Sequence, residues 1–202
     1  MKGLVLFSGG LDTTLVTLKL LDRGDAIIPL FMRYNQYQIV EEEDKSRKLI
    51  EYIRPQYMNL EALEVFEVPM PFKVGEAPGR PMAFLGLAVM LQPYYNFDYI
   101  ATGYQCQSGY VEATVPHQDL LAEAAKQLGI RYESPLLGMT KEEIGIELSK
   151  YQIPWEMMYT CFWSPSCGSK SKDDHYRCGG CRQKIRAMKA AGVECDTPNT
   201  YP

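Results

Sequence analysis

Two stretches of the chain combine residue types that bind ligands: a Ser-Gly-Gly loop near the N-terminus and a group of cysteines near the C-terminus. The loop, residues 8–14, joins an apolar run at residues 2–7 directly to a helix-like segment. Paired glycines let a backbone turn tightly and approach a ligand closely. Free amides at the start of the following helix, together with the helix dipole, favour an anion. The loop is therefore predicted to bind phosphate.

The side chains of this loop add to the prediction. The hydroxyls of Ser8, Thr13 and Thr14 can donate hydrogen bonds to phosphate oxygens, and Asp12 can help to hold Mg²⁺, the usual partner of nucleotide phosphates. Asp12 has a second interpretation, as the cap of a helix that begins at Thr13. No lysine follows the glycines, so the loop matches neither the Gly-x-x-x-x-Gly-Lys motif nor the three-glycine dinucleotide motif. The predicted nucleotide-binding residues are Phe7, Ser8, Gly9, Gly10, Leu11, Asp12, Thr13, Thr14 and Gly103.

The six cysteines are unevenly distributed, because four of them lie within 21 positions. Cys178 and Cys181 have the Cys-x-x-Cys spacing that lets two thiolates reach one tetrahedral Zn²⁺. We expect Cys161, Cys167, Cys178 and Cys181 to be the ligands, with His175 as the alternative to Cys167. Four protein ligands leave no open position, so this zinc would be structural. The alternative is that these cysteines are small buried hydrophobes.

The elements that must position these residues alternate along the chain. Apolar runs predict strands at residues 2–7, 25–32, 63–68 and 98–102, and helical periodicity predicts helices at 13–23, 41–53, 82–91, 118–128 and 141–151. The helix at 82–91 is nearly all apolar and is expected to be buried, and Thr140 with Glu143 forms a predicted capping box. The alternation predicts an α/β fold, a Rossmann-like parallel sheet with helices on both faces. Ligands bind at the carboxyl ends of such strands, where the loop and Gly103 lie.

We divide the chain into an α/β domain, residues 1–155, and a C-terminal zinc-binding helical segment, residues 156–202, packed on it as one compact unit. No apolar run approaches the roughly 18 residues that span a bilayer, and the N-terminal run is too short for a signal peptide. We therefore expect a cytoplasmic protein. The net charge of −4 argues against nucleic-acid binding through an overall positive field. Residues 168–192 carry seven basic and two acidic residues, which we interpret as a solvated basic last helix or, alternatively, a surface for phosphates or RNA.

The full string Ser-Gly-Gly-Leu-Asp-Thr-Thr resembles the pyrophosphate loop of the N-type ATP pyrophosphatases, or PP-loop superfamily. With the cysteine group, the chain resembles one family above the others, the 7-cyano-7-deazaguanine synthases of queuosine biosynthesis. The resemblance extends over most of the chain. It includes Tyr34-Asn35-Gln36 followed by Glu41, Pro78-Gly79-Arg80, Ile100-Ala101-Thr102-Gly103, Ser134-Pro135-Leu136, Thr140-Lys141-Glu142-Glu143-Ile144, Cys178-Gly179-Gly180-Cys181 and the terminal Asp196-Thr197-Pro198 with Tyr201.

This resemblance implies a ligase that converts 7-carboxy-7-deazaguanine and ammonia into 7-cyano-7-deazaguanine (preQ0) through adenylylated intermediates, releasing AMP and pyrophosphate. It implies Mg²⁺ with ATP, a structural Zn²⁺ and a homodimer, in which Tyr94-Tyr95 and Tyr99 are candidate interface residues. Ser8, Asp12, Arg80 and Lys141 are the expected catalytic residues, since charge at the α- and β-phosphates must be neutralised. Arg80 has a second interpretation as a surface ion-pair partner, and Lys141 as a helix-start residue.

Three departures from the family pattern bear on the substrate. Glu112-Ala113-Thr114-Val115-Pro116-His117 stands where the family has Asp-Cys-Arg-Pro-Glu-Phe, Pro81 follows Arg80, and His175 stands where the family has a zinc cysteine. Two alternatives therefore stay open. One is a related zinc-bearing PP-loop enzyme that thiolates tRNA or forms an amide, with Cys106 as the candidate catalytic cysteine. The other is a non-catalytic ATP-binding module.

Overall fold

A computed structural model describes residues 1–70, 79–105, 113–161 and 178–193 of the 202-residue chain. Several residues singled out from the sequence lie outside these ranges. They are Pro78, Cys106, Glu112, Cys167, His175, Asp196, Thr197, Pro198 and Tyr201.

Five parallel strands form one sheet in the order β3-β2-β1-β4-β5. They are β1 (Lys2–Leu6), β2 (Ala26–Arg33), β3 (Glu64–Glu67), β4 (Tyr99–Ala101) and β5 (Arg131–Glu133). The interiors of β1 and β2 are buried, because helices cover both faces of the sheet, and this explains why these strands read as unbroken apolar runs. The strand order reverses between β1 and β4, so the fold is Rossmann-like, as the sequence predicts.

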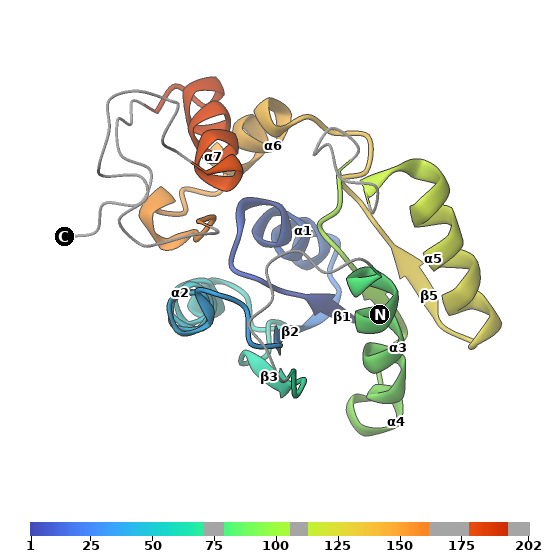
Figure 1. Cartoon of the computed structure of the whole chain (residues 1–202). Coiled ribbons are helices and arrows are strands. Elements are labelled where there is room, and N and C mark those ends of the chain that lie inside the picture. Colours follow the sequence, from blue (N-terminus) through green and yellow to red (C-terminus); the bar gives the residue numbers. More distant parts are fainter. Residues whose placement is uncertain (71–78, 106–112, 162–177, 194–202) are drawn as a thin grey trace.

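One face of the sheet is covered by α1 (Leu11–Asp22) and α2 (Ile39–Ile53), whose apolar side chains form a core with Val5 and Phe31. Beyond α1 lie α6 (Lys141–Ser149) and α7 (Gly179–Ala190), which pack against each other (Figure 1). The α6–α7 contact is close: a Cβ on Gly145 would lie 2.1 Å from the Ala187 carbonyl oxygen. The helices α1, α6 and α7 therefore form a stack on this side of the sheet.

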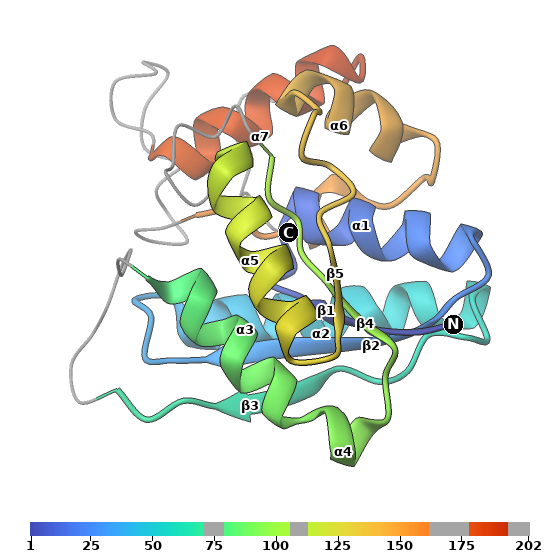
Figure 2. The ribbon, with the colours of Figure 1, turned by 90° about the vertical axis from the view of Figure 1, so that its right-hand side faces the viewer.

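The other face is covered by α3 (Arg80–Met90) and α5 (Val115–Gln127), which lie in front of the sheet in Figure 2. Their buried residues, including Leu85 and Leu121, pack on Leu4 and Ile28 of the sheet. The remaining described elements are α4 (Gln92–Tyr95), η1 (Arg54–Gln56) and η4 (Trp155–Met157). None of the helices within the described ranges is long and apolar enough to cross a membrane.

The structure corrects several details of the sequence reading. The first helix begins at Leu11 rather than Thr13, and α5 begins at Val115 rather than at residue 118. The α3 helix is not buried all round, since Met82 is 36% exposed and Met90 is 76% exposed. Strand β5 was not predicted, because three residues after Gly129 carry no periodicity of their own.

Tyr99 is fully buried inside the chain and is therefore unavailable to a dimer interface. Its hydroxyl donates to Asp25 across 2.7 Å, and Asp25 also contacts the Met1 amino group at 3.1 Å and Arg23 at 2.6 Å. Burial alone would raise the pKa of the Asp25 carboxyl, but these hydrogen bonds lower that pKa below its ordinary value. The network fixes the amino-terminal edge of the sheet, opposite the edge where ligands are expected.

Candidate functional site

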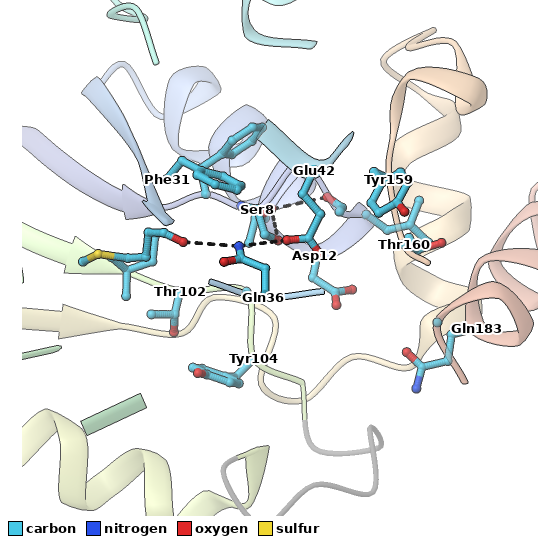
Figure 3. A pocket seen from close by; sticks show the side chains of 18 of the residues that line it. Ser8, Asp12, Phe31, Gln36, Glu42, Thr102, Tyr104, Tyr159, Thr160 and Gln183 are labelled. Atoms are coloured by element: carbon cyan, nitrogen blue, oxygen red, sulfur yellow. Dashed lines mark hydrogen bonds between the residues drawn. The ribbon is translucent and has the colours of Figure 1, made fainter. Parts of the chain in front are cut away.

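A cavity of about 720 Å³ opens at the carboxyl ends of β1, β2 and β4. It lies where the strand order reverses, which is the position that open α/β sheets use for ligands. Its walls come from segments far apart in the chain: the Ser-Gly-Gly loop, the end of β2, the starts of α2 and α3, and the starts of α6 and α7. Figure 3 shows Ser8, Asp12, Gln36 and Glu42 grouped together, with Tyr159 and Thr160 to one side of them.

The glycine loop has the backbone that the sequence predicts. Gly9 has φ +69°, a left-handed conformation that favours glycine, and a Cβ there would lie 2.5 Å from the Ser46 hydroxyl. Gly10 is the N-cap of α1 and has no side-chain cap, so the first amides of α1 remain available to a ligand. Gly103 approaches from β4, and a Cβ there would lie 2.9 Å from the Thr13 nitrogen. Glycine at 103 therefore lets β4 reach the start of α1.

The hydroxyls of the loop divide into two groups. Ser8 and Thr13 line the cavity, and their hydroxyl oxygens are 3.4 Å apart. Thr14 is fully buried and donates to the Gly10 carbonyl oxygen across 2.7 Å, so its hydroxyl supports the helix start instead of facing the cavity. Phe7, Gly10 and Leu11 also line the cavity.

Asp12 does not cap α1, because it lies within the helix and Gly10 takes the N-cap position. Its carboxylate pairs through both oxygens with the ammonium group of Lys141, whose side chain is 11% exposed. Lys141 is the first residue of α6, and the Thr140–Glu143 capping box that fixes this helix start forms as predicted. The pair brings together two candidate residues that are 129 positions apart in sequence.

Arg80 also lines the cavity, at the first position of α3. Its guanidinium donates to the Tyr34 hydroxyl across 2.9 Å, and the Tyr34 ring meets Phe84 edge to face at 5.1 Å. Arg80 is thus held against an aromatic wall beside the cavity.

A buried Gln36 and a half-buried Glu42 form the wall beside the end of β2, and neither was named as a candidate side chain from the sequence. Gln36 donates to Glu42 across 3.0 Å. Burial raises the pKa of Glu42 to about 7, while the hydrogen bond from Gln36 and the charge of Arg80 oppose that rise. The helical spacing of Glu42 with the buried Ser46 is the signal that could have separated it from its exposed acidic neighbours.

The segment after η4 closes the cavity on the side of the loop. Tyr159 donates its backbone N–H to the Gly9 carbonyl oxygen across 2.9 Å, and Thr160 lines the cavity next to it. Lys184 of α7 is fully buried, lines the cavity and donates to the Met158 carbonyl oxygen across 2.6 Å. The last helix is therefore not simply a solvated basic helix, since Lys184 points inward.

The described part of the segment that departs from the family pattern, residues 113–117, lies outside the cavity lining. Ala113 is buried, and Val115, Pro116 and His117 form the first turn of α5. Residues 113–117 do not line the cavity.

Cys161, Cys178 and Cys181 are buried together, with all three sulfur atoms within 4.8 Å of one another. The Cys178 sulfur lies 3.9 Å from that of Cys161 and 3.5 Å from that of Cys181. These separations are too long for a disulfide and match the spacing of about 3.8 Å between thiolates on a tetrahedral zinc with bonds of about 2.3 Å. The three cysteines therefore fit a metal ion, and both predicted sources of a fourth ligand, Cys167 and His175, lie outside the described residues.

Comparison with known proteins places the chain in a family. The sequence model of the family described as "Queuosine biosynthesis protein QueC" matches residues 67–192, which is more than half of the chain. The chain belongs to the QueC family. This confirms the resemblance carried by the glycine loop and the cysteine group.

Three similar curated QueC relatives have the name 7-cyano-7-deazaguanine synthase. The protein of Nautilia profundicola is 23% identical, and the alignment covers 98% of this chain and 97% of that protein. The protein of Persephonella marina is 26% identical over 95% of this chain and 93% of that protein, and that of Methanocaldococcus jannaschii is 25% identical over 98% of both.

A similar solved structure is that of "U34-tRNA thiolase NcsA from Methanococcus maripaludis with its [4Fe-4S] cluster". The TM-score is 0.51 at 13% identity, over 95% of this QueC-family chain and 70% of the thiolase. At this identity the likeness shows the fold alone.

Proposed function

We propose that this QueC-family chain is an ATP-dependent ligase that converts 7-carboxy-7-deazaguanine and ammonia into 7-cyano-7-deazaguanine, releasing AMP and pyrophosphate. The observation that carries the proposal is the convergence of the glycine loop, Lys141 and Arg80 on one cavity at the reversal of strand order. The names of the relatives support the product, and the family resemblance implies the substrate.

The proposed reaction uses ATP twice. A substrate carboxylate oxygen attacks the α-phosphorus of ATP, and the bond to pyrophosphate breaks. Ammonia then attacks the carbonyl carbon, loses a proton and displaces AMP, which leaves an amide. The amide oxygen attacks a second ATP in the same way, pyrophosphate leaves, and the amide nitrogen loses one of its two protons. Loss of AMP together with the second N–H proton then gives the nitrile.

Each attack concentrates negative charge on the α-phosphate and on the departing pyrophosphate, and the chain offers fixed positive groups there. The amides at the start of α1 are uncapped, Lys141 pairs with Asp12 of the loop, and Arg80 lines the same cavity. Ser8 and Thr13 supply hydroxyl donors. Asp12 is the candidate ligand for the Mg²⁺ that accompanies ATP, and such an ion would neutralise phosphate charge.

We further propose that Cys161, Cys178 and Cys181 bind a structural Zn²⁺ together with Cys167 or His175. The ion would hold residues 156–202 on the α/β domain of residues 1–155. In this way it would fix Tyr159 and Lys184 at the cavity. We also propose a cytoplasmic homodimer, in which Tyr94, which is 81% exposed, remains a candidate contact.

The test is incubation of the purified chain with 7-carboxy-7-deazaguanine, ammonia, ATP and Mg²⁺, followed by mass spectrometry and nucleotide analysis. We expect the nitrile and two AMP for each nitrile formed. AMP formation that depends on a different acceptor would refute the proposed substrate. ATP binding without any formation of AMP would refute the proposal that the chain is an enzyme.

A further inference from the structure

One carboxyl group in the cavity has no part in the proposed phosphate chemistry. Glu42 lies near the start of α2, one helical turn before Ser46, which packs on Gly9. Its side chain lines the cavity, and Figure 3 shows it together with Gln36 beside Ser8. A carboxyl group next to a phosphate loop is electrostatically unfavourable for ATP, so its presence calls for another ligand group that donates hydrogen bonds.

The neighbouring Gln36 fixes this carboxyl group. Gln36 is 6% exposed, and its amide oxygen accepts from the Tyr34 backbone N–H across 3.0 Å. Its amide nitrogen donates to the Met32 carbonyl oxygen at 3.4 Å and to Oε2 of Glu42 at 3.0 Å. Both ends of the amide are therefore used within the protein, and Gln36 cannot rotate without losing a buried hydrogen bond. Glu42 is held in one orientation, and no described residue donates a hydrogen bond to its Oε1.

The surrounding wall suits a flat heterocycle. Phe31, Met32 and Phe84 line the same cavity as Glu42, and the Tyr34 ring stands edge to face with Phe84. Apolar and aromatic walls with a few fixed polar groups are typical of sites for small ring compounds. On this wall Glu42 is the acidic group, so it can select the ring by its pattern of donors.

We propose that Glu42 is a specificity-determining residue that accepts hydrogen bonds from the adjacent N1–H and 2-amino groups of the deazaguanine substrate. This inference rests on the proposed function, since it names the substrate of the same site. An ionised carboxylate is acceptor-only and has two oxygens, which match two neighbouring donors. The adenine of ATP presents an amino donor next to the acceptor N1, which an ionised carboxylate repels. Glu42 would therefore distinguish the two heterocycles that the enzyme must bind.

The assignment predicts how binding depends on pH. Since burial raises the pKa of Glu42 to about 7, the carboxyl group changes its charge in the range where the protein can be assayed. A guanine-type edge binds the ionised form, so its affinity rises from about pH 6 to about pH 8. An adenine edge would need the protonated form, and its affinity would fall. The charged groups facing Glu42 are Arg80 from α3, Glu41 on α2 and, elsewhere on the cavity wall, Asp12, Lys141 and Lys184.

Equilibrium binding by titration calorimetry tests the inference on the full-length protein. The ligands are 7-carboxy-7-deazaguanine, its analogue without the 2-amino group, and the non-hydrolysable α,β-methylene-ATP. The variant is Glu42→Gln, which keeps the size of the side chain and its acceptor for Gln36, and the matched control is Glu41→Gln on the same helix.

We expect Glu42→Gln to lower the affinity for 7-carboxy-7-deazaguanine about ten- to a hundredfold, which is the range for losing a bidentate base contact. The variant should also abolish the rise of this affinity with pH. The analogue without the 2-amino group should bind the unaltered protein more weakly than 7-carboxy-7-deazaguanine does. Glu42→Gln should reduce the affinity for this analogue by a smaller factor than the affinity for 7-carboxy-7-deazaguanine. Binding of α,β-methylene-ATP should change by less than about twofold. Glu41→Gln should keep the rise of substrate affinity with pH, moved to lower pH because the charge of Glu41 helps to raise the pKa of Glu42.

The inference would be overturned if the unaltered protein bound 7-carboxy-7-deazaguanine with an affinity that is flat or falls with pH, a result that needs no variant to fold. It would equally be overturned if Glu42→Gln bound the substrate with unchanged affinity, or if the variant lost affinity for α,β-methylene-ATP instead. Nitrile formation by the unaltered protein separates the two proposals. If the unaltered protein binds the substrate with the expected rise of affinity with pH but forms no nitrile, only the proposed function is refuted. If the unaltered protein forms the nitrile and Glu42→Gln is equally active, only the role of Glu42 is refuted.

Discussion

Replacing Gly103 with alanine tests whether the loop depends on the close approach of β4. A Cβ at this position would lie 2.9 Å from the Thr13 nitrogen and 3.0 Å from the Asp12 carbonyl carbon and Cβ. Ordinary van der Waals contact begins near 3.4 Å, so the start of α1 must move by about 0.5 Å to admit the methyl group. The atoms that must move are mainly backbone, and no flexible side-chain end can yield instead. Gly103 is not in the left-handed region, so the backbone itself accepts alanine and only the contact changes.

Two consequences follow from this displacement. Forcing a methyl group into a packed contact costs about 1–3 kcal/mol of stability. A misplacement of 1 Å at a reacting centre can cost about a hundredfold in rate, so about 0.5 Å predicts a loss of about tenfold in kcat/KM for ATP. The matched control is Gly138→Ala, because a Cβ at Gly138 meets nothing within 4 Å. We expect Gly138→Ala to match the unaltered protein within about twofold.

The assay combines urea denaturation with the initial rate of pyrophosphate release at varied ATP concentration. Stability measured at the assay temperature separates a displaced loop from an unfolded protein, since a loss of about 3 kcal/mol leaves most domains folded. If Gly103→Ala kept both its stability and its kcat/KM for ATP within about twofold, β4 would not constrain the loop, and the cavity would have to bind ATP in another way.

Three further perturbations probe the other contacts. Lys141→Met should lower kcat/KM for ATP about a hundredfold in the pyrophosphate assay, the effect of losing one charged group at the transition state, and unchanged kinetics would remove Lys141 from the reaction. Asp25→Asn should lower the free energy of unfolding by about 3 kcal/mol in urea denaturation at neutral pH, because Arg23 and the terminal amine lose their partner. The pKa of Asp25 is lowered on folding, so this stability is present above the unfolded pKa of about 3.9 and is lost as pH falls through the folded pKa. The stability of the variant should therefore fall less steeply than that of the unaltered protein at acid pH. Cys181→Ser should lower the bound zinc, measured by elemental analysis, and the melting temperature together, whereas zinc retained at one ion per chain would exclude this cysteine as a ligand.

The order and type of the main elements could be predicted because the interior of the sheet imposes apolar runs and the glycine loop lies between a strand and a helix. The Thr140–Glu143 capping box is a local device, and its four-residue signature is sufficient to find it. Strand β5 was missed because its three residues form a strand only through pairing with β4. Tyr99 was misread as an interface residue because its partner Asp25 is 74 positions away, and sequence does not show that contact.

The candidate site also has parts that the sequence shows and parts that depend on contacts between distant segments. The phosphate loop is contiguous in sequence, so its place at the end of the first strand could be predicted, although the sequence does not show that the Thr14 hydroxyl supports the helix start instead of facing the cavity. The pairing of Asp12 with Lys141 depends on how α6 stacks on α1. Glu42 stands in a run of four acidic residues, Glu41 to Asp44, that is typical of a solvated helix face. Only the phase of α2, fixed by Ser46 against Gly9, turns one of the four toward the cavity.

Three of the helices that begin at this cavity, α1, α6 and α7, explain why no single side chain should be indispensable for phosphate binding. The first turns of α1, α6 and α7 contribute Leu11, Lys141 and Gly179 to its lining. Each helix start has the electrostatic effect of about half a positive charge, and the backbone supplies it without any ionisable group. Lys141→Met therefore removes the charge of one side chain but leaves all three helix starts in place. We expect this variant to bind α,β-methylene-ATP with an affinity reduced by no more than about tenfold while its turnover falls about a hundredfold, because the lysine acts chiefly on the charge that develops as pyrophosphate departs. An equal loss of binding and turnover would instead show that Lys141 holds the ground state, and that the helix starts contribute little.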